Sequence, residues 1–235
     1  MTVMKELRFA LKKTVPVLFA YLFIGISFGM MMYTAGYSWI WSFLSALFVY
    51  AGSLQIVMVS LLKAGAGLMT CALTAFFINA RHLFYGIAFI ERFRAMGWRS
   101  PYMVFSLTDE TYSILVSADY GEGLNRDRAA FFIALTNHIY WIIGCLTGSL
   151  AGRILPWDME GIEFSAAAFF IVVVIEQWEK SASKLPACVG LIVGALFFLI
   201  LGPDRFLIPS LVSSVLILML LGDRIRIKEG MTDEN

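Results

Sequence analysis

Three ionisable side chains stand inside apolar stretches of this sequence, where a membrane-spanning helix would exclude them. Arg81 lies at the centre of TAFFINARHLFYGIAF, and Asp109 and Glu110 are adjacent in SLTDETY. Membrane-insertion scales assign a free-energy cost of roughly 2.5–3.5 kcal/mol to an Arg, Lys or Asp at the centre of a helix. The three together cost on the order of 8–10 kcal/mol before any pairing. Such residues must face the interior of a helix bundle, pair with one another, or meet water and substrate.

A binding role for Arg81 follows from the shape of its guanidinium, whose paired N–H groups match the two oxygens of a carboxylate. The alternative is a structural ion pair with Asp109 or Glu110 that only fastens two helices. We expect one of these two acids to pair with Arg81 and the other to take up and release protons. A further alternative places both acids in an interfacial loop, in contact with water.

The residues around Arg81 extend this polar surface. On one continuous helix, Asn79, His82 and Gly86 fall on one stripe, and Arg81 and Tyr85 fall on the next. The two stripes are about 100° apart and form one broad polar face. His82 is either a hydrogen-bonded core residue or a group whose charge changes near neutral pH.

Two further segments carry uncharged polar side chains, in YAGSLQIV and ALTNHIYW. These side chains either tie helices together, at roughly 0.6–2 kcal/mol each, or bind polar groups of a substrate. The predicted substrate-binding or coupling residues are therefore Gln55, Asn79, Arg81, His82, Tyr85, Asp109, Glu110, Asn137 and His138.

Several classes of function find no support in the sequence. Walker A, HExxH, GxSxG and GxGxxG motifs are missing, and the three cysteines have no CxxC spacing. Two histidines in different segments do not make a metal site. We therefore predict no enzyme, no catalytic residue, no metal and no cofactor. The net charge of +1 gives no reason to expect a nucleic-acid partner.

The elements that must position these residues are predicted to be membrane helices. Of 235 residues, 60% are hydrophobic and 15% are charged, against roughly 25% charged in an ordinary soluble domain. Mean hydropathy is +0.79. We predict an all-α, polytopic membrane helix bundle in the lipid bilayer. Its eight hydrophobic segments span about 14–34, 39–62, 67–90, 101–117, 129–150, 163–178, 185–201 and 206–221.

The charges suggest an orientation in the cytoplasmic (inner) membrane. We expect one integral membrane domain over 1–235, with short cytoplasmic tails at 1–13 and 223–235, because both tails are rich in Lys and Arg. One loop disagrees: Arg92, Arg94 and Arg99 lie outside if all eight segments cross. Six spans plus two re-entrant pieces, formed by 67–90 and 101–117, would place every basic loop in the cytoplasm.

Glycines four residues apart predict close helix packing. Such pairs occur at Gly25 and Gly29, along Gly144, Gly148 and Gly152, and in the segment 185–201. Small residues at this spacing let two helix backbones approach, within one chain or toward a partner.

The polar motifs resemble a known family. YAGSLQ (50–55), NARHLFYG (79–86), LTDETY (107–112) and EFSAAAFFIVVVIEQW (163–178) are similar, in order and spacing, to the AzlC-type branched-chain amino acid permeases. The resemblance covers roughly residues 10 to 220. It implies the large subunit of an exporter of valine, leucine or isoleucine, working with a small, separate AzlD-like membrane subunit.

Two functions remain in competition at this point. The first is a secondary transporter, proton-coupled, that exports branched-chain amino acids, with Arg81 on the substrate carboxylate and the acids on its ammonium group or on protons. The second is a membrane assembly or sensor subunit without transport, in which the intramembrane charges are a structural clasp. The sequence alone leaves the exact substrate, coupling ion, direction of transport and oligomeric state open.

Overall fold

The computed structural model describes residues 2–121, 123–154, 171, 174–175, 178–179, 183–202 and 206–221. The predicted segment 163–178 falls largely outside these residues, and the tail 223–235 falls entirely outside them. Within the described part the ordered elements are helices and no strand occurs, which confirms the all-α prediction. The chain forms two compact units, Met1–Ala66 with Ile78–Ala166, and Gly67–Phe77 with Ala167–Asn235.

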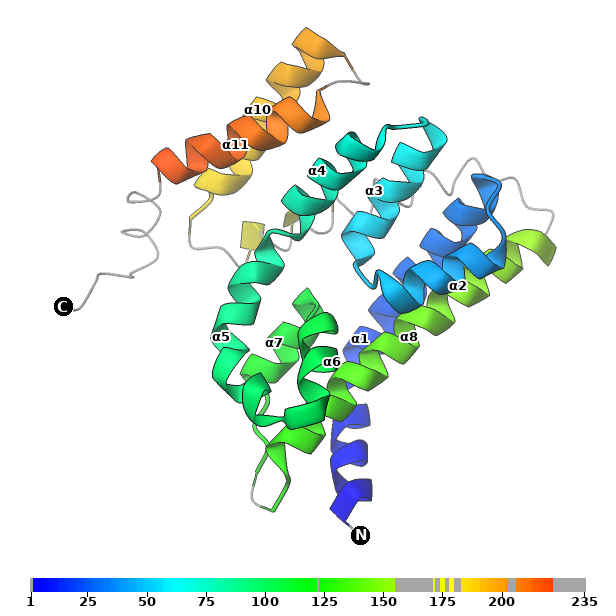
Figure 1. Cartoon of the computed structure of the whole chain (residues 1–235), viewed down its shortest axis with the longest axis vertical. Coiled ribbons are helices and arrows are strands. Elements are labelled where there is room, and N and C mark those ends of the chain that lie inside the picture. Colours follow the sequence, from blue (N-terminus) through cyan, green and yellow to red (C-terminus); the bar gives the residue numbers. More distant parts are fainter. Residues whose placement is uncertain are drawn as a thin grey trace. The chain divides into compact units, whose positions relative to one another are not determined.

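Two long helices form the frame of the first unit. α1 (Thr2–Thr34) has 33 residues and α8 (Arg126–Ile154) has 29, and they pack along each other (Figure 1). At 1.5 Å per residue these helices are about 50 and 43 Å long, against about 30 Å of bilayer hydrocarbon. Both are long and apolar enough to cross a membrane.

The contact between α1 and α8 is made by glycines. A Cβ added to Gly144 would lie 2.7 Å from the carbonyl oxygen of Tyr21, and one added to Gly25 would lie 3.0 Å from the amide nitrogen of Cys145. Cβ atoms added to Gly29 or Gly148 would also meet the backbone of the other helix. We call Gly25, Gly29, Gly144 and Gly148 the glycine seam. The close packing predicted from their spacing is confirmed and is internal to the chain.

Three predicted segments are not single helices. The segment 39–62 divides into α2 (Trp39–Phe48) and α3 (Gly52–Lys63), and 67–90 divides into α4 (Leu68–Asn79) and α5 (Arg81–Ala95). The segment 101–117 divides into α6 (Ser100–Phe105), preceded by the short η1 (Gly97–Arg99), and α7 (Asp109–Ser117). We call the interruptions at 49–51, 80 and 106–108 the three breaks.

A backbone conformation marks the first break, and a helix cap marks the third. Tyr50 adopts φ 43°, a left-handed conformation that an α-helix does not accommodate. Thr108 is extended and caps α7, because its hydroxyl accepts a hydrogen bond from the amide of Thr111. At Ala80 the backbone is right-handed and no side chain caps α5. Because α4 ends at Asn79 and α5 begins at Arg81, the polar face expected on one continuous helix is divided between two helices.

A hydrophobic core fixes α5, α6 and α7 against the frame. Phe89 and Phe93 from α5, Met103 from α6 and Leu115 from α7 pack with Ile133 of α8. Each of these side chains is nearly or completely buried. This core anchors the helices that begin at the second and third breaks.

The second unit contains α10 (Leu185–Leu201) and α11 (Leu207–Leu220), which pack on each other. The rings of Phe198 and Phe206 meet edge to face at 5.2 Å. Their outer surfaces are apolar, as expected for a membrane protein, with Leu199 and Leu220 more than four-fifths exposed. Gly190 and Gly194 meet no described atom within 4 Å of an added Cβ, so this pair makes no close contact in the described part.

Candidate functional site

The three breaks meet at one pocket of about 240 Å³. The first break contributes 49–51, the second contributes Asn79 and His82, and the third contributes Leu107 and Thr108. The remaining lining residues are Gly86, Phe93, Val104 and Phe105. The lining thus combines polar side chains at the breaks, from Asn79, His82 and Thr108, with apolar side chains on α5 and α6.

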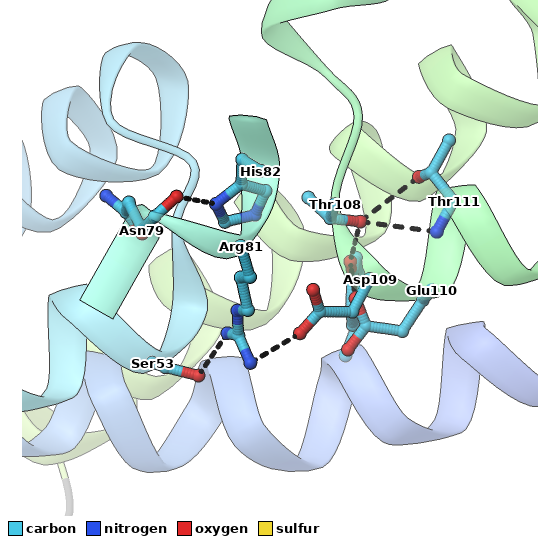
Figure 2. Close-up of polar contacts among 9 residues, drawn as sticks. Ser53, Asn79, Arg81, His82, Thr108, Asp109, Glu110 and Thr111 are labelled. Carbon is cyan, nitrogen blue, oxygen red and sulfur yellow. Dashed lines mark hydrogen bonds and ion pairs between the residues drawn. The ribbon is translucent and has the colours of Figure 1, made fainter. Parts of the chain in front are cut away.

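Beside the pocket, one ion pair joins helices that start at different breaks. Arg81 Nη1 lies 2.9 Å from Asp109 Oδ2, and Arg81 Nη2 donates a hydrogen bond to Ser53 Oγ at 3.1 Å (Figure 2). Arg81 and Asp109 are the first residues of α5 and α7, and Ser53 is the second residue of α3. The ion pair expected between Arg81 and one of the acids is formed by Asp109. Neither charged residue lines the pocket, although His82 and Thr108, their neighbours, do.

The ion pair leaves two of its own polar atoms unused. Arg81 Nε and Asp109 Oδ1 are buried and have no hydrogen-bond partner among the described residues. A guanidinium N–H is a donor suited to a carboxylate, and a carboxylate oxygen is an acceptor suited to an ammonium group. Together this donor and this acceptor match the carboxylate and the ammonium group of a zwitterion.

Helix polarity adds to this arrangement. α3, α5 and α7 all begin at the three breaks, and the N-terminal end of a helix favours negative charge. α7 fills its own first turn with Asp109 and Glu110. The starts of α3 and α5 carry no acid in their first turns, and Asp109 lies at the start of α5 through its ion pair with Arg81.

The second acid is held apart from the ion pair. Tyr21 of α1 donates its hydroxyl hydrogen to Glu110 Oε2 at 2.7 Å, and the same hydroxyl lies 2.8 Å from Thr108 Oγ1. Thr108 Oγ1 lies 3.2 Å from Thr111 Oγ1, which accepts from Asn137 Nδ2 at 3.0 Å. These bonds make a continuous polar path from Glu110 to the buried Asn137 of α8.

Gln55 holds the first break in place. Its Oε1 accepts from Trp141 Nε1 and from the backbone amide of Ala51, each at 3.0 Å, and its Nε2 donates to Ser45 Oγ at 2.7 Å. Gln55 is fully buried and does not line the pocket. Its contacts tie α2, α3 and α8 together.

His138 supports the same break from the other side. Its Nε2 lies 3.2 Å from the carbonyl oxygen of Ala46, which can only accept, so this nitrogen carries the hydrogen. In the neutral ring, Nδ1 then accepts from the hydroxyl of Tyr102 at 3.1 Å. The ring stacks on Tyr50 with centroids 4.2 Å apart, which holds the left-handed residue at the break.

The two remaining predicted residues lie on α5. His82 Nδ1 is 3.2 Å from the carbonyl oxygen of Asn79, so it acts as the donor, and the ring faces the pocket. Tyr85 stacks on Tyr112 with centroids 4.5 Å apart and does not line the pocket. Among the described residues no group of three His, Cys, Asp or Glu side chains could hold a metal ion.

The predicted residues therefore divide by position. Asn79 and His82 line the pocket, and Arg81 and Asp109 pair beside it. Tyr85 lies next to Asp109 and stacks on Tyr112. The remaining four, Gln55, Glu110, Asn137 and His138, do not line the pocket and bond to neighbouring helices. The sequence reasoning missed Tyr21 and the cap at Thr108. A hydroxyl residue directly before two acids is a recognisable helix start, whereas nothing local connects Tyr21 to Glu110.

Comparisons with known proteins agree with this architecture of apolar helices. Residues 16–155 match the family described as AzlC protein. The chain is 36% identical to an uncharacterized membrane protein of Helicobacter pylori, over 92% of this chain and 95% of the relative. It is 32% identical to the branched-chain amino acid transport protein AzlC of Bacillus subtilis, over 91% and 84%. An uncharacterized membrane protein of Haemophilus influenzae is 35% identical, over 87% and 84%. No solved structure matches.

Proposed function

The chain belongs to the AzlC family, and on that premise we propose that it exports branched-chain amino acids across the cytoplasmic membrane as a secondary transporter. It is a membrane protein, and the relative named for a function is a transport protein. That name supports transport of the same class of substrate by this chain.

The observation that carries the proposal is the pair of unused polar atoms at Arg81 and Asp109. A free amino acid has one carboxylate and one ammonium group close together, which match the free N–H of Arg81 and the free oxygen of Asp109. Because both atoms are buried, a substrate reaches them only when the breaks shift. Such interrupted helices are the usual place of substrate sites in secondary transporters.

The rest of the proposed site follows from the lining of the pocket. Asn79 and His82 bind the polar part of the substrate at the breaks. The apolar lining residues Phe93, Val104 and Phe105 accept the aliphatic side chain. Gln55 and His138 act through the first break, which they hold in position.

We further propose that export is coupled to the movement of protons. Glu110 is bonded to Tyr21 and not to Arg81, which leaves its carboxylate free to bind and release a proton without breaking the ion pair. Tyr21, Thr108, Thr111 and Asn137 continue the polar path away from it. Coupling predicts that collapse of the proton gradient stops efflux, and that Glu110→Gln removes this dependence.

We also propose how the transporter lies in the membrane and which subunit it works with. Both tails lie in the cytoplasm, and a small AzlD-like subunit completes the exporter, as the family resemblance implies. Arg92 pairs with Asp127 at 3.6 Å and donates to the carbonyl oxygen of Arg126, which supports the six-span alternative because both loops then lie on one side of the membrane. Single cysteines at Arg94 and Arg126, labelled from one side of the membrane, test this: cytoplasmic labelling of both supports six spans, and opposite labelling supports eight crossings.

The direct test is efflux of labelled valine from preloaded cells or vesicles that contain the chain, with and without its small partner. We expect efflux that depends on the chain and is lost in Arg81→Ala at normal protein level. Arg153→Ala is the matched control, because Arg153 lies at the far end of α8 from the site. Efflux unchanged in Arg81→Ala would remove Arg81 from the binding site.

A second candidate function is the assembly or sensor subunit. It is favoured by one observation: Arg81 and Asp109 bond three helix starts together and do not line the pocket. In that case the exchanged pair Arg81→Asp with Asp109→Arg restores assembly, and neither the chain nor the exchanged pair exports valine.

A further inference from the structure

One of the residues that line the pocket is a glycine, which leaves bare backbone at that point of the wall. Gly86 lines it one turn of α5 after His82, about 6 Å along the helix axis. Phe93 lines the same face two turns further on. The surface along α5 thus changes from a polar ring to bare backbone and then to an aromatic ring.

Packing among the described residues does not require a glycine at position 86. A Cβ added there would meet no described atom within 4 Å, whereas one added to Gly144 in the glycine seam would lie 2.7 Å from a carbonyl oxygen. Gly86 is also not required by the backbone, because it lies inside a regular helix and does not have a positive φ. Glycine is less favourable than alanine in a helix interior. What a side chain at this position would remove is open volume in the pocket.

We propose that Gly86 sets the largest aliphatic side chain that the site accepts. The inference rests on the proposed amino acid transport. With the charged groups of the substrate held at the three breaks, its side chain extends along α5 past Gly86 toward Val104 and Phe105. Added atoms at position 86 occupy the space of the outermost substrate methyl groups. Leucine and isoleucine then lose more than valine, and valine loses more than alanine.

The test measures efflux of labelled leucine, valine and alanine in direct competition from one preloaded preparation. For Gly86→Ala we expect the leucine-to-valine ratio to fall about 10-fold or more, since one methylene in an apolar pocket discriminates by about 10 to 200-fold. For Gly86→Val we expect efflux of valine to fall as well, with alanine retained. Gly190→Ala is the matched control, because it also adds a methyl group to a helical glycine with no described neighbour.

The outcomes separate this inference from the function on which it rests. An unchanged leucine-to-valine ratio in Gly86→Ala, with wild-type efflux intact, overturns the role of Gly86 and leaves the transport proposal standing. Equal loss of all three substrates in Gly86→Ala, at normal protein level, also overturns it. If the wild-type chain exports none of the three, the transport proposal itself fails, and the role of Gly86 fails with it.

Discussion

Along the glycine seam, α1 and α8 run uninterrupted and come together until backbone meets backbone. Around the pocket, by contrast, three hydrophobic segments stop and restart, and polar residues occupy the gaps. The seam leaves no room for a single methyl group, while the pocket keeps about 240 Å³ open. The two regions share one unit of the chain.

The seam holds two helices in fixed positions, whereas the breaks supply groups that can bind a substrate. Close contact between continuous helices gives dense packing, which resists change because any added atom must displace backbone. A broken helix exposes backbone groups and gathers side chains whose bonds can be exchanged. We expect substitutions in the seam to reduce stability, and substitutions at the breaks to reduce transport with little loss of stability.

The largest effect is expected for Gly148→Ala. The added Cβ would meet the carbonyl oxygen of Ile26, so α1 and α8 must separate. We expect a loss of about 3 kcal/mol in the free energy of unfolding, the upper part of the usual range for added core atoms. Thermal unfolding in detergent measures it, with Gly190→Ala as the control. Equal melting temperatures of the two variants would contradict a close-packed seam.

An intermediate effect is expected for Gln55→Leu, at the boundary between the two regions. Leucine fills a similar volume but leaves the N–H groups of Trp141 and Ala51 without their acceptor. Each unsatisfied group costs about 1–3 kcal/mol, and burial of the leucine methyl groups offsets part of the sum, so we expect a net loss of about 2 kcal/mol. A double-mutant cycle with Trp141→Phe isolates the indole bond. Strict additivity in that cycle would mean that this bond does not stabilise the break.

The smallest effect on stability is expected for Asp109→Asn. Asparagine keeps an oxygen that can accept from Arg81 Nη1, so Arg81 is not left alone in the apolar segment, and we expect a loss of only about 1 kcal/mol for the removed charge. Valine efflux should nevertheless fall to background. The control is Asp127→Asn, which removes the 3.6 Å ion pair with Arg92 away from the pocket and should leave efflux unchanged. A fall in melting temperature as large as that of Gly148→Ala would mean that Asp109 is needed for the stability of the fold.

Some of this architecture was readable in the sequence. The spacing of Gly144 and Gly148 predicted a close helix contact, because a four-residue interval repeats on one helix face. Which helix would be the partner was not readable, since α1 lies more than a hundred residues away. The pairing of Arg81 with one of the two acids followed from the cost of leaving them alone in an apolar segment.

The breaks were the main failure of sequence reasoning. Around Ala80 the chain has no proline and no glycine before Gly86, so periodicity favoured one continuous helix. At Tyr50 a bulky residue adopts a conformation that is uncommon outside glycine, and tertiary contacts with His138 stabilise it. Only the third break carried a local signal, the hydroxyl of Thr108 ahead of two acids. Contacts made across the fold decide the other two.

The glycine seam also limits how the gene can vary in length. Gly25 and Gly29 face α8 only because four residues separate them, and each residue turns a helix by about 100°. A one-codon insertion between them would swing the second glycine off the contact and bring a large side chain into its place. Insertions and deletions compatible with the fold therefore fall in connections such as 35–38, and the interval between the seam glycines stays constant wherever this helix pair is kept.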